Sequence, residues 1–143
     1  MSIRQATMTT AIVMALAMTA VVLPGCGAVE APVDLNGTEW RLVSWSDTEV
    51  DPTPHEITLS LADGQASGRA PVNSYTGGFE FTPEGAFSTS EIAQTLMAGS
   101  DEAMQAETVY MGLLGNVDSF RMEGANLVLV GDGTDLLEFE PVQ

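Results

Sequence analysis

The fold is decided by the stretch ITLSLADGQASGR, residues 57–69. Its apolar residues Ile57, Leu59 and Leu61 alternate with Thr and Ser, and this period of two predicts a β-strand with one buried face. The strand ends at Ala62-Asp63-Gly64, which is typical of a tight turn, and the residues up to Arg69 return as the next strand. The stretch therefore predicts an antiparallel hairpin.

The same pattern recurs on both sides of this hairpin, with turn residues at short, regular intervals. The segment 71–78, PVNSYTGG, is rich in turn formers and is predicted to be a turn. The predicted strands cover 40–45, 57–61, 65–69, a fourth marked by Phe79 and Phe81, 86–89, 117–122, 127–130 and 136–140. This pattern indicates a mainly β protein.

One segment follows a helical period instead. Ser100 offers a capping oxygen, and Asp101 and Glu102 suit the positive end of a helix. Apolar residues then recur at steps of three and four over 103–114, and Gly115 is placed to end the helix. We therefore expect an amphipathic helix between the fifth and sixth strands.

Eight short antiparallel strands can close into a barrel and so remove their exposed edges, while a helix can plug one end. The predicted fold class is mainly β: a small antiparallel barrel of about eight strands, with one amphipathic helix between strands five and six. Four methionines on or beside the helix are expected to fill the core: Met97, Met104, Met111 and Met122.

The N-terminal residues predict export. Residues 1–10 carry one positive charge, and 11–23 form an apolar run that is too short for a permanent transmembrane helix. The run ends in LPGC, which resembles the lipobox of bacterial lipoproteins, and this implies cleavage before Cys26 and diacylation of its thiol. We expect a signal peptide over 1–25, the lipidated Cys26 with a short tether over 26–34, and a globular domain over 35–143.

Composition narrows the possible partners. The chain has 20 Asp and Glu against four basic residues, for a formal charge of −16. So few basic residues cannot neutralise a run of phosphates, which excludes nucleic acid as a partner. The single cysteine cannot form an internal disulfide, so Cys26 is expected to be the membrane anchor.

Several segments carry a family resemblance. They are LNGTEW at 35–40, GRAPVNSYTG at 68–77 and TLMA at 95–98, followed by the acidic helix with Glu107 and Tyr110. Their order and spacing resemble the META domain, the HslJ-like family of bacterial secreted and envelope proteins. The resemblance implies a lipocalin-like barrel with a helix and an association with heat-shock response, antibiotic tolerance, secretion or motility. It implies no catalytic residues.

Two positions depart from the family pattern. Many members carry one Cys just before the Asn and another just after Met-Ala, where this chain has Val72 and Gly99. The joint loss is expected if the two positions are neighbours in the fold. It argues against a redox or metal role.

The family motif supplies the candidate site residues, which are Asn73, Ser74, Tyr75, Gly77, Thr95 and Met97. Asn bonds its own backbone in turns, and paired glycines allow positive φ. We interpret the segment as a structured turn. The alternative is a ligand-contacting loop at the mouth of the barrel.

The inventory for catalysis is small. His55 is the only histidine, it lies in the Pro-rich stretch 51–55, and it is expected to be a solvated turn residue. The acidic segments 47–51 and 132–135 do not match an EF-hand loop. We expect no enzymatic activity, no metal and no cofactor.

These observations favour a monomeric, non-catalytic module, anchored by lipid on the extracytoplasmic side of a bacterial membrane. It would act in the envelope or in stress responses, through a protein or cell-wall partner. One alternative is a carrier that holds a small apolar molecule inside the barrel. A remote alternative is a hydrolase that uses His55.

Overall fold

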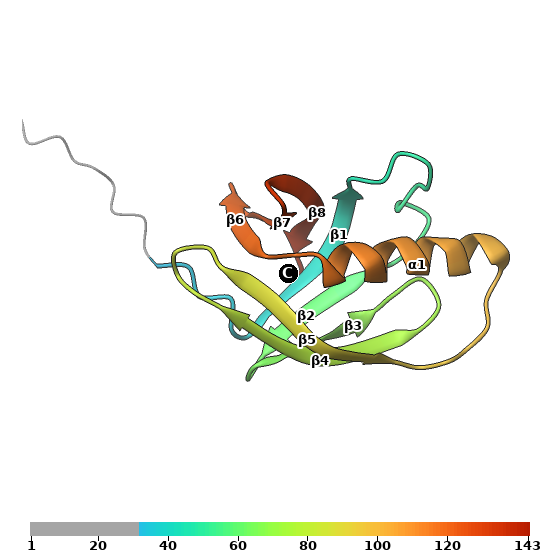
Figure 1. Ribbon diagram of the computed structural model, residues 1–143, viewed down its shortest axis with the longest axis horizontal. Helices are drawn as coiled ribbons and strands as arrows, with labels where there is room; N and C mark the ends of the chain where they lie inside the picture. The colour runs from blue at the N-terminus through green and yellow to red at the C-terminus, as the bar shows by residue number, and fades with distance from the viewer. Residues whose placement is uncertain (1–31) are drawn as a thin grey trace, which may run out of the picture. The chain divides into compact units, whose positions relative to one another are not determined.

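The computed structural model describes residues 32–143, so Cys26 and the predicted signal peptide lie outside the described residues. These residues form eight strands and one helix (Figure 1). Their order is β1 (Thr38–Trp45), β2 (Thr58–Ala62), β3 (Gln65–Arg69), β4 (Ser74–Phe81), β5 (Phe87–Gln94), α1 (Asp101–Gly115), β6 (Ser119–Glu123), β7 (Asn126–Gly131) and β8 (Thr134–Pro141).

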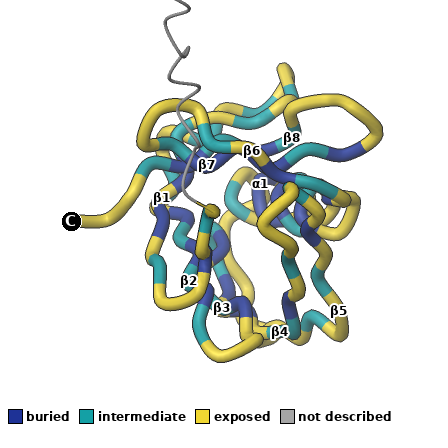
Figure 2. The backbone as a smooth tube through the Cα atoms, turned by 90° about the vertical axis from the view of Figure 1, so that its left-hand side faces the viewer, coloured by how far each residue is buried: buried dark blue, intermediate teal, exposed yellow. Residues whose placement is uncertain are grey.

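The strands form one antiparallel sheet in the order β5-β4-β3-β2-β1-β8-β7-β6. Two runs of hairpin-connected strands are thus joined in the middle, where β1 pairs with β8. Helix α1 connects β5 at one edge of the sheet to β6 at the other. Seen end-on, the strands curl around α1 (Figure 2).

The two edges meet at one point. Ala86 forms an isolated bridge with Ser119, and Phe120 N donates to Gly85 O at 2.8 Å. The architecture is therefore a curled half-barrel, and the predicted fold class is confirmed. Closure is partial because α1 occupies the space between the edges, where Thr89 Oγ1 donates to Leu114 O at 3.5 Å.

The concave side of the sheet and one face of α1 enclose a hydrophobic core. Its largest fully buried side chains are Tyr110, Phe87, Phe139, Leu35, Ile57, Leu59, Leu61, Leu114, Leu127, Leu129 and Leu137. Removing this much apolar surface from water is the main stabilising term of the fold.

Two hairpin turns have the backbone conformation that their Asp-Gly sequences favour. Asp63 and Gly64 have φ values of 52° and 75°, and Asp132 and Gly133 have 50° and 72°. Two consecutive positive φ values define the turn that matches the twist of paired strands, and Asp-Gly adopts them readily. The turn predicted at 62–64 is therefore confirmed, and Asp132-Gly133 forms a second turn with the same φ signs.

The turn predicted over 71–78 is wrong for most of its length. Ser74 begins β4, and Tyr75 pairs with Gly68 on one side and Gln94 on the other. Because β4 lies inside the sheet, its glycines serve close strand packing and have no positive φ. Strand β5 also runs on to Gln94, beyond its predicted end at residue 89.

Helix α1 begins where expected. The Ser100 hydroxyl accepts a hydrogen bond from Ala103 N at 3.2 Å, and two acids occupy the first turn. Its buried residues are Ala106, Glu107, Tyr110 and Leu114. Two of the four methionines expected in the core are exposed, Met97 at 57% and Met104 at 38%.

Candidate functional site

The motif residues meet around a carboxylate on α1. Glu107 is 3% exposed, and its Oε2 accepts hydrogen bonds from Val72 N at 2.9 Å and Asn73 N at 2.6 Å. Its Oε1 accepts from Asn73 Nδ2 at 2.6 Å. Burying a carboxylate is costly unless hydrogen bonds compensate it, and here three N–H groups do so. Glu107 therefore ties α1 to the corner between β3 and β4.

The side chain of Asn73 passes this connection on to the segment that follows β5. Its Oδ1 accepts from Thr95 Oγ1 at 2.8 Å and from Met97 N at 2.7 Å, and its Nδ2 also donates to Met97 O at 3.3 Å. Thr95 Oγ1 accepts in turn from Ser74 N at 3.2 Å. One buried amide thus joins the β3–β4 corner, the end of β5 and α1.

Two tyrosines form a second contact below this network. The Tyr75 hydroxyl donates to Thr58 O at 2.7 Å, so the Tyr110 hydroxyl, 2.7 Å away, donates to Tyr75. Burial raises the pKa of both phenols above the usual value, and for Tyr110 the neighbouring Tyr75 adds to the increase. Both hydroxyls are satisfied, so the pair secures α1 to β2 and β4.

Two motif glycines provide room for this arrangement. A Cβ on Gly68 would lie 2.0 Å from Thr58 O and 2.9 Å from the Tyr75 hydroxyl oxygen. A Cβ on Gly77 would lie 2.8 Å from Ser90 O, where β5 bulges and Glu91 has a φ of 49°. The expected role of Gly77 in a positive-φ turn is therefore wrong, and its role is to accommodate the bulge.

The structure thus brings Asn73, Ser74, Tyr75, Thr95 and Met97 into one corner, whereas Gly77 lies further along β4. Glu107 and Tyr110 are central to it, although the sequence indicated them only through the family resemblance. The sequence does contain one signal that Glu107 is buried. Ala103, Glu107, Tyr110 and Leu114 follow steps of four, three and four, which places an acid within the apolar stripe.

The expectation that Val72 and Gly99 are neighbours is confirmed. A Cβ on Gly99 would lie 3.5 Å from Val72 Cβ and 2.7 Å from its Cγ2. The first of these distances falls within the range found between the Cβ atoms of a disulfide. Val72 therefore fills the space in which the family resemblance implies a cysteine pair.

His55 lies in the connection between β1 and β2, away from this corner. It is only partly exposed, and its Nε2 is buried without a hydrogen-bond partner among residues 32–143. His55 does lie in a turn, where its backbone N–H donates to Pro52 O at 3.0 Å, but the ring is only partly solvated because Nε2 is buried. No hydrogen bond to a serine, threonine or carboxylate was found that would make the ring a catalytic base, within that same range.

The acidic segments form turns with their own backbone. Asp47 Oδ1 accepts from Glu49 N and Val50 N, and Asp51 Oδ1 accepts from Thr53 N, which lowers the pKa of Asp51. In the part of the chain that the structure describes, no group of three or more His, Cys, Asp or Glu could hold a metal ion. The helix in this part is also too short and too polar to cross a bilayer.

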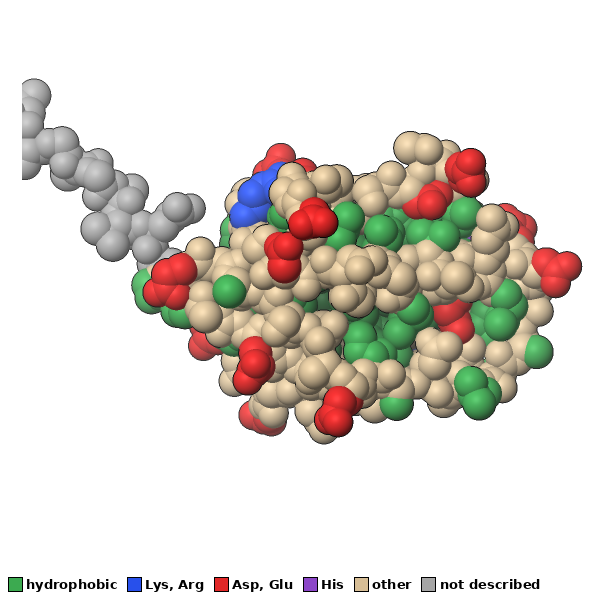
Figure 3. All heavy atoms as spheres, viewed as in Figure 1, with side chains coloured by type: hydrophobic (Ala, Val, Ile, Leu, Met, Phe, Trp, Pro, Cys, Tyr) green, Lys and Arg blue, Asp and Glu red, His purple; other side chains and the backbone are tan. Residues whose placement is uncertain are grey.

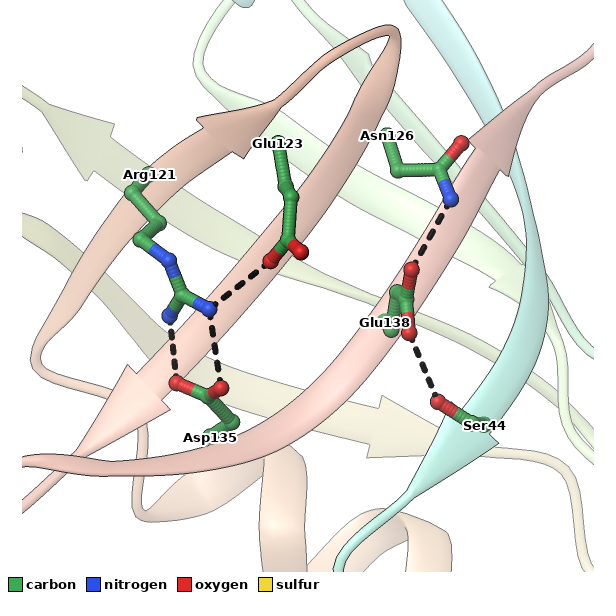
Figure 4. Close-up of polar contacts among 6 residues, drawn as sticks. All are labelled: Ser44, Arg121, Glu123, Asn126, Asp135 and Glu138. Atoms are coloured by element: carbon green, nitrogen blue, oxygen red, sulfur yellow. Dashed lines mark hydrogen bonds and ion pairs between the residues drawn. The ribbon is translucent and has the colours of Figure 1, made fainter.

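The outer face of the sheet carries a separate polar cluster (Figure 4). Arg121 on β6 donates to both oxygens of Asp135 on β8, which lowers the pKa of that carboxyl, and to Glu123 at 3.0 Å. Glu138 accepts from Ser44 at 3.0 Å and Asn126 at 2.9 Å. These exposed pairs order the surface of the second hairpin run.

The largest of five surface grooves compared has a volume of about 510 Å³ and lies over β1, β2, β3 and β8, with Arg41 and Arg69 in its wall. Tyr110 and the inward-facing leucines of β2 and β7 line none of these five grooves. Side chains fill the interior at those positions.

Comparison with known proteins identifies the family. A family model described as META domain matches residues 33–143, so the chain belongs to the META domain family. No match is found among curated proteins.

Two solved structures resemble the chain. One is the NMR structure of a protein from Burkholderia xenovorans, with 26% identity and a TM-score of 0.63, covering 76% of this chain and 84% of that one. The other, also an NMR structure, has 15% identity and a TM-score of 0.57, covers 76% of this chain and 94% of that one, and shows the fold alone.

Proposed function

We propose that this protein is a lipid-anchored lipoprotein of the bacterial envelope, whose META domain is a non-catalytic binding or structural module on the extracytoplasmic side. The anchor is argued from the sequence LPGC at 23–26 after an apolar run. The 35–143 domain then extends from Cys26 through the tether over 26–34.

The proposal that the domain is non-catalytic rests on the hydrogen bonding of the motif residues. The carboxylate of Glu107 and the side-chain amide of Asn73 form hydrogen bonds with backbone and side-chain groups of the protein itself. A nucleophile or general base needs a reactive atom directed at a substrate. The motif supports a scaffold role instead.

The two alternatives find less support. A carrier of apolar molecules needs an interior chamber, and the inward positions hold large side chains that are less than 2% exposed. A hydrolase based on His55 needs a nucleophile beside that ring.

The anchor is tested by Cys26→Ser in the full chain, produced in a bacterium fed an alkyne analogue of palmitate. We expect the wild type to incorporate the label and to sediment with membranes. The variant should lose the label and move to the soluble fraction, with unchanged circular dichroism of the domain. Labelling of the variant, or its full retention on membranes, would contradict the proposal.

A further inference from the structure

The segment between β5 and α1 exposes large apolar side chains. Leu96 is 92% exposed and Met97 57%, and Met104 follows in the first turns of α1 at 38%. Among residues 32–143, one other large hydrophobic side chain is more exposed than Met104: Val142, at 48%. Single exposed apolar residues are ordinary, but a concentration in one short segment marks an interaction surface.

This segment is held in place from behind. Asn73 bonds both the N–H and the C=O of Met97, and Thr95 N donates to Ser74 O at 3.0 Å. Behind the same segment, Gly99 lies against Val72, and Ser100 caps α1. The backbone that carries Leu96 and Met97 is thus fixed before any partner arrives, which reduces the entropy lost on binding.

Along the chain, this segment is flanked by acids and by no base. No Lys, Arg or His occurs between Arg69 and Arg121, a stretch that contains β4, β5 and α1. The acids next to the segment are Glu91 on β5 and Asp101 and Glu102 in the first turn of α1. The other acids of this stretch lie elsewhere: Glu107 is buried, and Glu80, Glu84 and Asp118 lie toward the opposite end of β4 and β5. On the face shown in Figure 3, a single basic patch lies near β6, acidic side chains are scattered over the whole face, and hydrophobic ones protrude at the end where the segment enters α1.

We propose that Leu96 and Met97 form a docking ridge for a protein partner whose surface has an apolar pocket bordered by Lys or Arg. The apolar side chains supply affinity, and the acids around them select a basic rim. A second copy of this chain would bring like charges together, and an anionic lipid surface would be repelled in the same way. This inference names the partner class of the proposed binding module and rests on that proposal.

The test is photocrosslinking in the source bacterium, with benzoylphenylalanine in place of Leu96 in the full chain. The same residue at Val142, which is 48% exposed, serves as the matched control. We expect a protein adduct at position 96 that is absent at position 142. A phospholipid adduct, an adduct of twice the chain's own mass, or equal yields at the two positions would each overturn the proposal.

The captured protein is then identified, purified and titrated against the purified full chain. Its affinity should fall about tenfold for Leu96→Ser, as expected for an anchor residue, and should weaken with salt. Val142→Ser should leave it unchanged. A partner without a basic surface, or an affinity that Leu96→Ser does not alter, would also overturn it. Membrane fractionation of Cys26→Ser tests the lipid anchor independently of the docking ridge. Failure of the anchor proposal can therefore be distinguished from failure of the docking proposal.

Discussion

The carboxylate of Glu107 lies 2.6 Å from the side-chain nitrogen of Asn73, 34 residues earlier in the chain. This contact joins the helix to the corner between β3 and β4, and Asn73 carries the connection on to the loop after β5. Asn73 and Glu107 therefore fix α1 and the exposed loop to the sheet.

Glu107→Ala should destabilise the domain by about 3 kcal/mol, because three N–H groups, two of them buried, lose their acceptor. Urea denaturation of the 33–143 domain measures the loss. Glu102→Ala, in the exposed first turn of the same helix, is the control and should cost about 0.5 kcal/mol or less. Equal losses would mean that the network contributes no more than a surface acid.

The domain should lose stability in alkali. Tyr75 and Tyr110 are the only tyrosines, and burial raises the pKa of both in the folded state above the unfolded value of about 10. Their contribution is therefore complete below pH 10 and is lost as the pH rises above it. The rise of tyrosinate absorbance at 295 nm should coincide with the loss of circular dichroism. A rise near pH 10 in a still folded protein would contradict the buried placement.

The double variant Val72→Cys/Gly99→Cys should form a disulfide in a domain that lacks Cys26. The Cβ atoms are placed for it, and closing this loop should add about 3 kcal/mol to the free energy of unfolding. The gain should disappear in reductant. Gly99→Cys alone should destabilise, since its Cβ would meet Val72 Cγ2 at 2.7 Å. Absence of the bond under oxidising conditions would refute the contact.

Gly68→Ala should destabilise the domain by about 2 kcal/mol, because the new Cβ would collide with the backbone carbonyl of Thr58. Gly112→Ala is the matched control. A Cβ there meets nothing within 4 Å, so the change should stabilise α1 by about 0.5–1 kcal/mol. Thermal melts of both variants measure the change in stability, which should be a loss for Gly68→Ala and a gain for Gly112→Ala. If Gly68→Ala left the stability unchanged, the close approach of β2 and β3 would be contradicted.

Local patterns predicted most of the fold. Alternation, Asp-Gly turns and the Ser100 cap are short-range features, and the structure confirms the strand and helix order that follows from them. The partial opening of the barrel could not be predicted, because it depends on how α1 packs between two edges that are distant in sequence.

The candidate site was predicted less well. The glycines of 71–78 were interpreted through positive φ, whereas tertiary contacts put them inside a sheet. Glu107 is an acid on an apolar stripe, and only the folded partners of its carboxylate explain why it is buried. Leu96 and Met97 are exposed because Asn73 holds their backbone from the inner side, a constraint that no local pattern records.

The position of the last strand has a consequence for how the chain folds. Because β8 pairs with β1, and Arg41 lies opposite Glu140, residues 99 apart must meet before the two hairpin runs become one sheet. Such distant pairing slows folding, because the chain must close a long loop before these two strands gain any contact. Deleting the final ten residues would therefore divide the domain at its centre, although in sequence it only shortens an end.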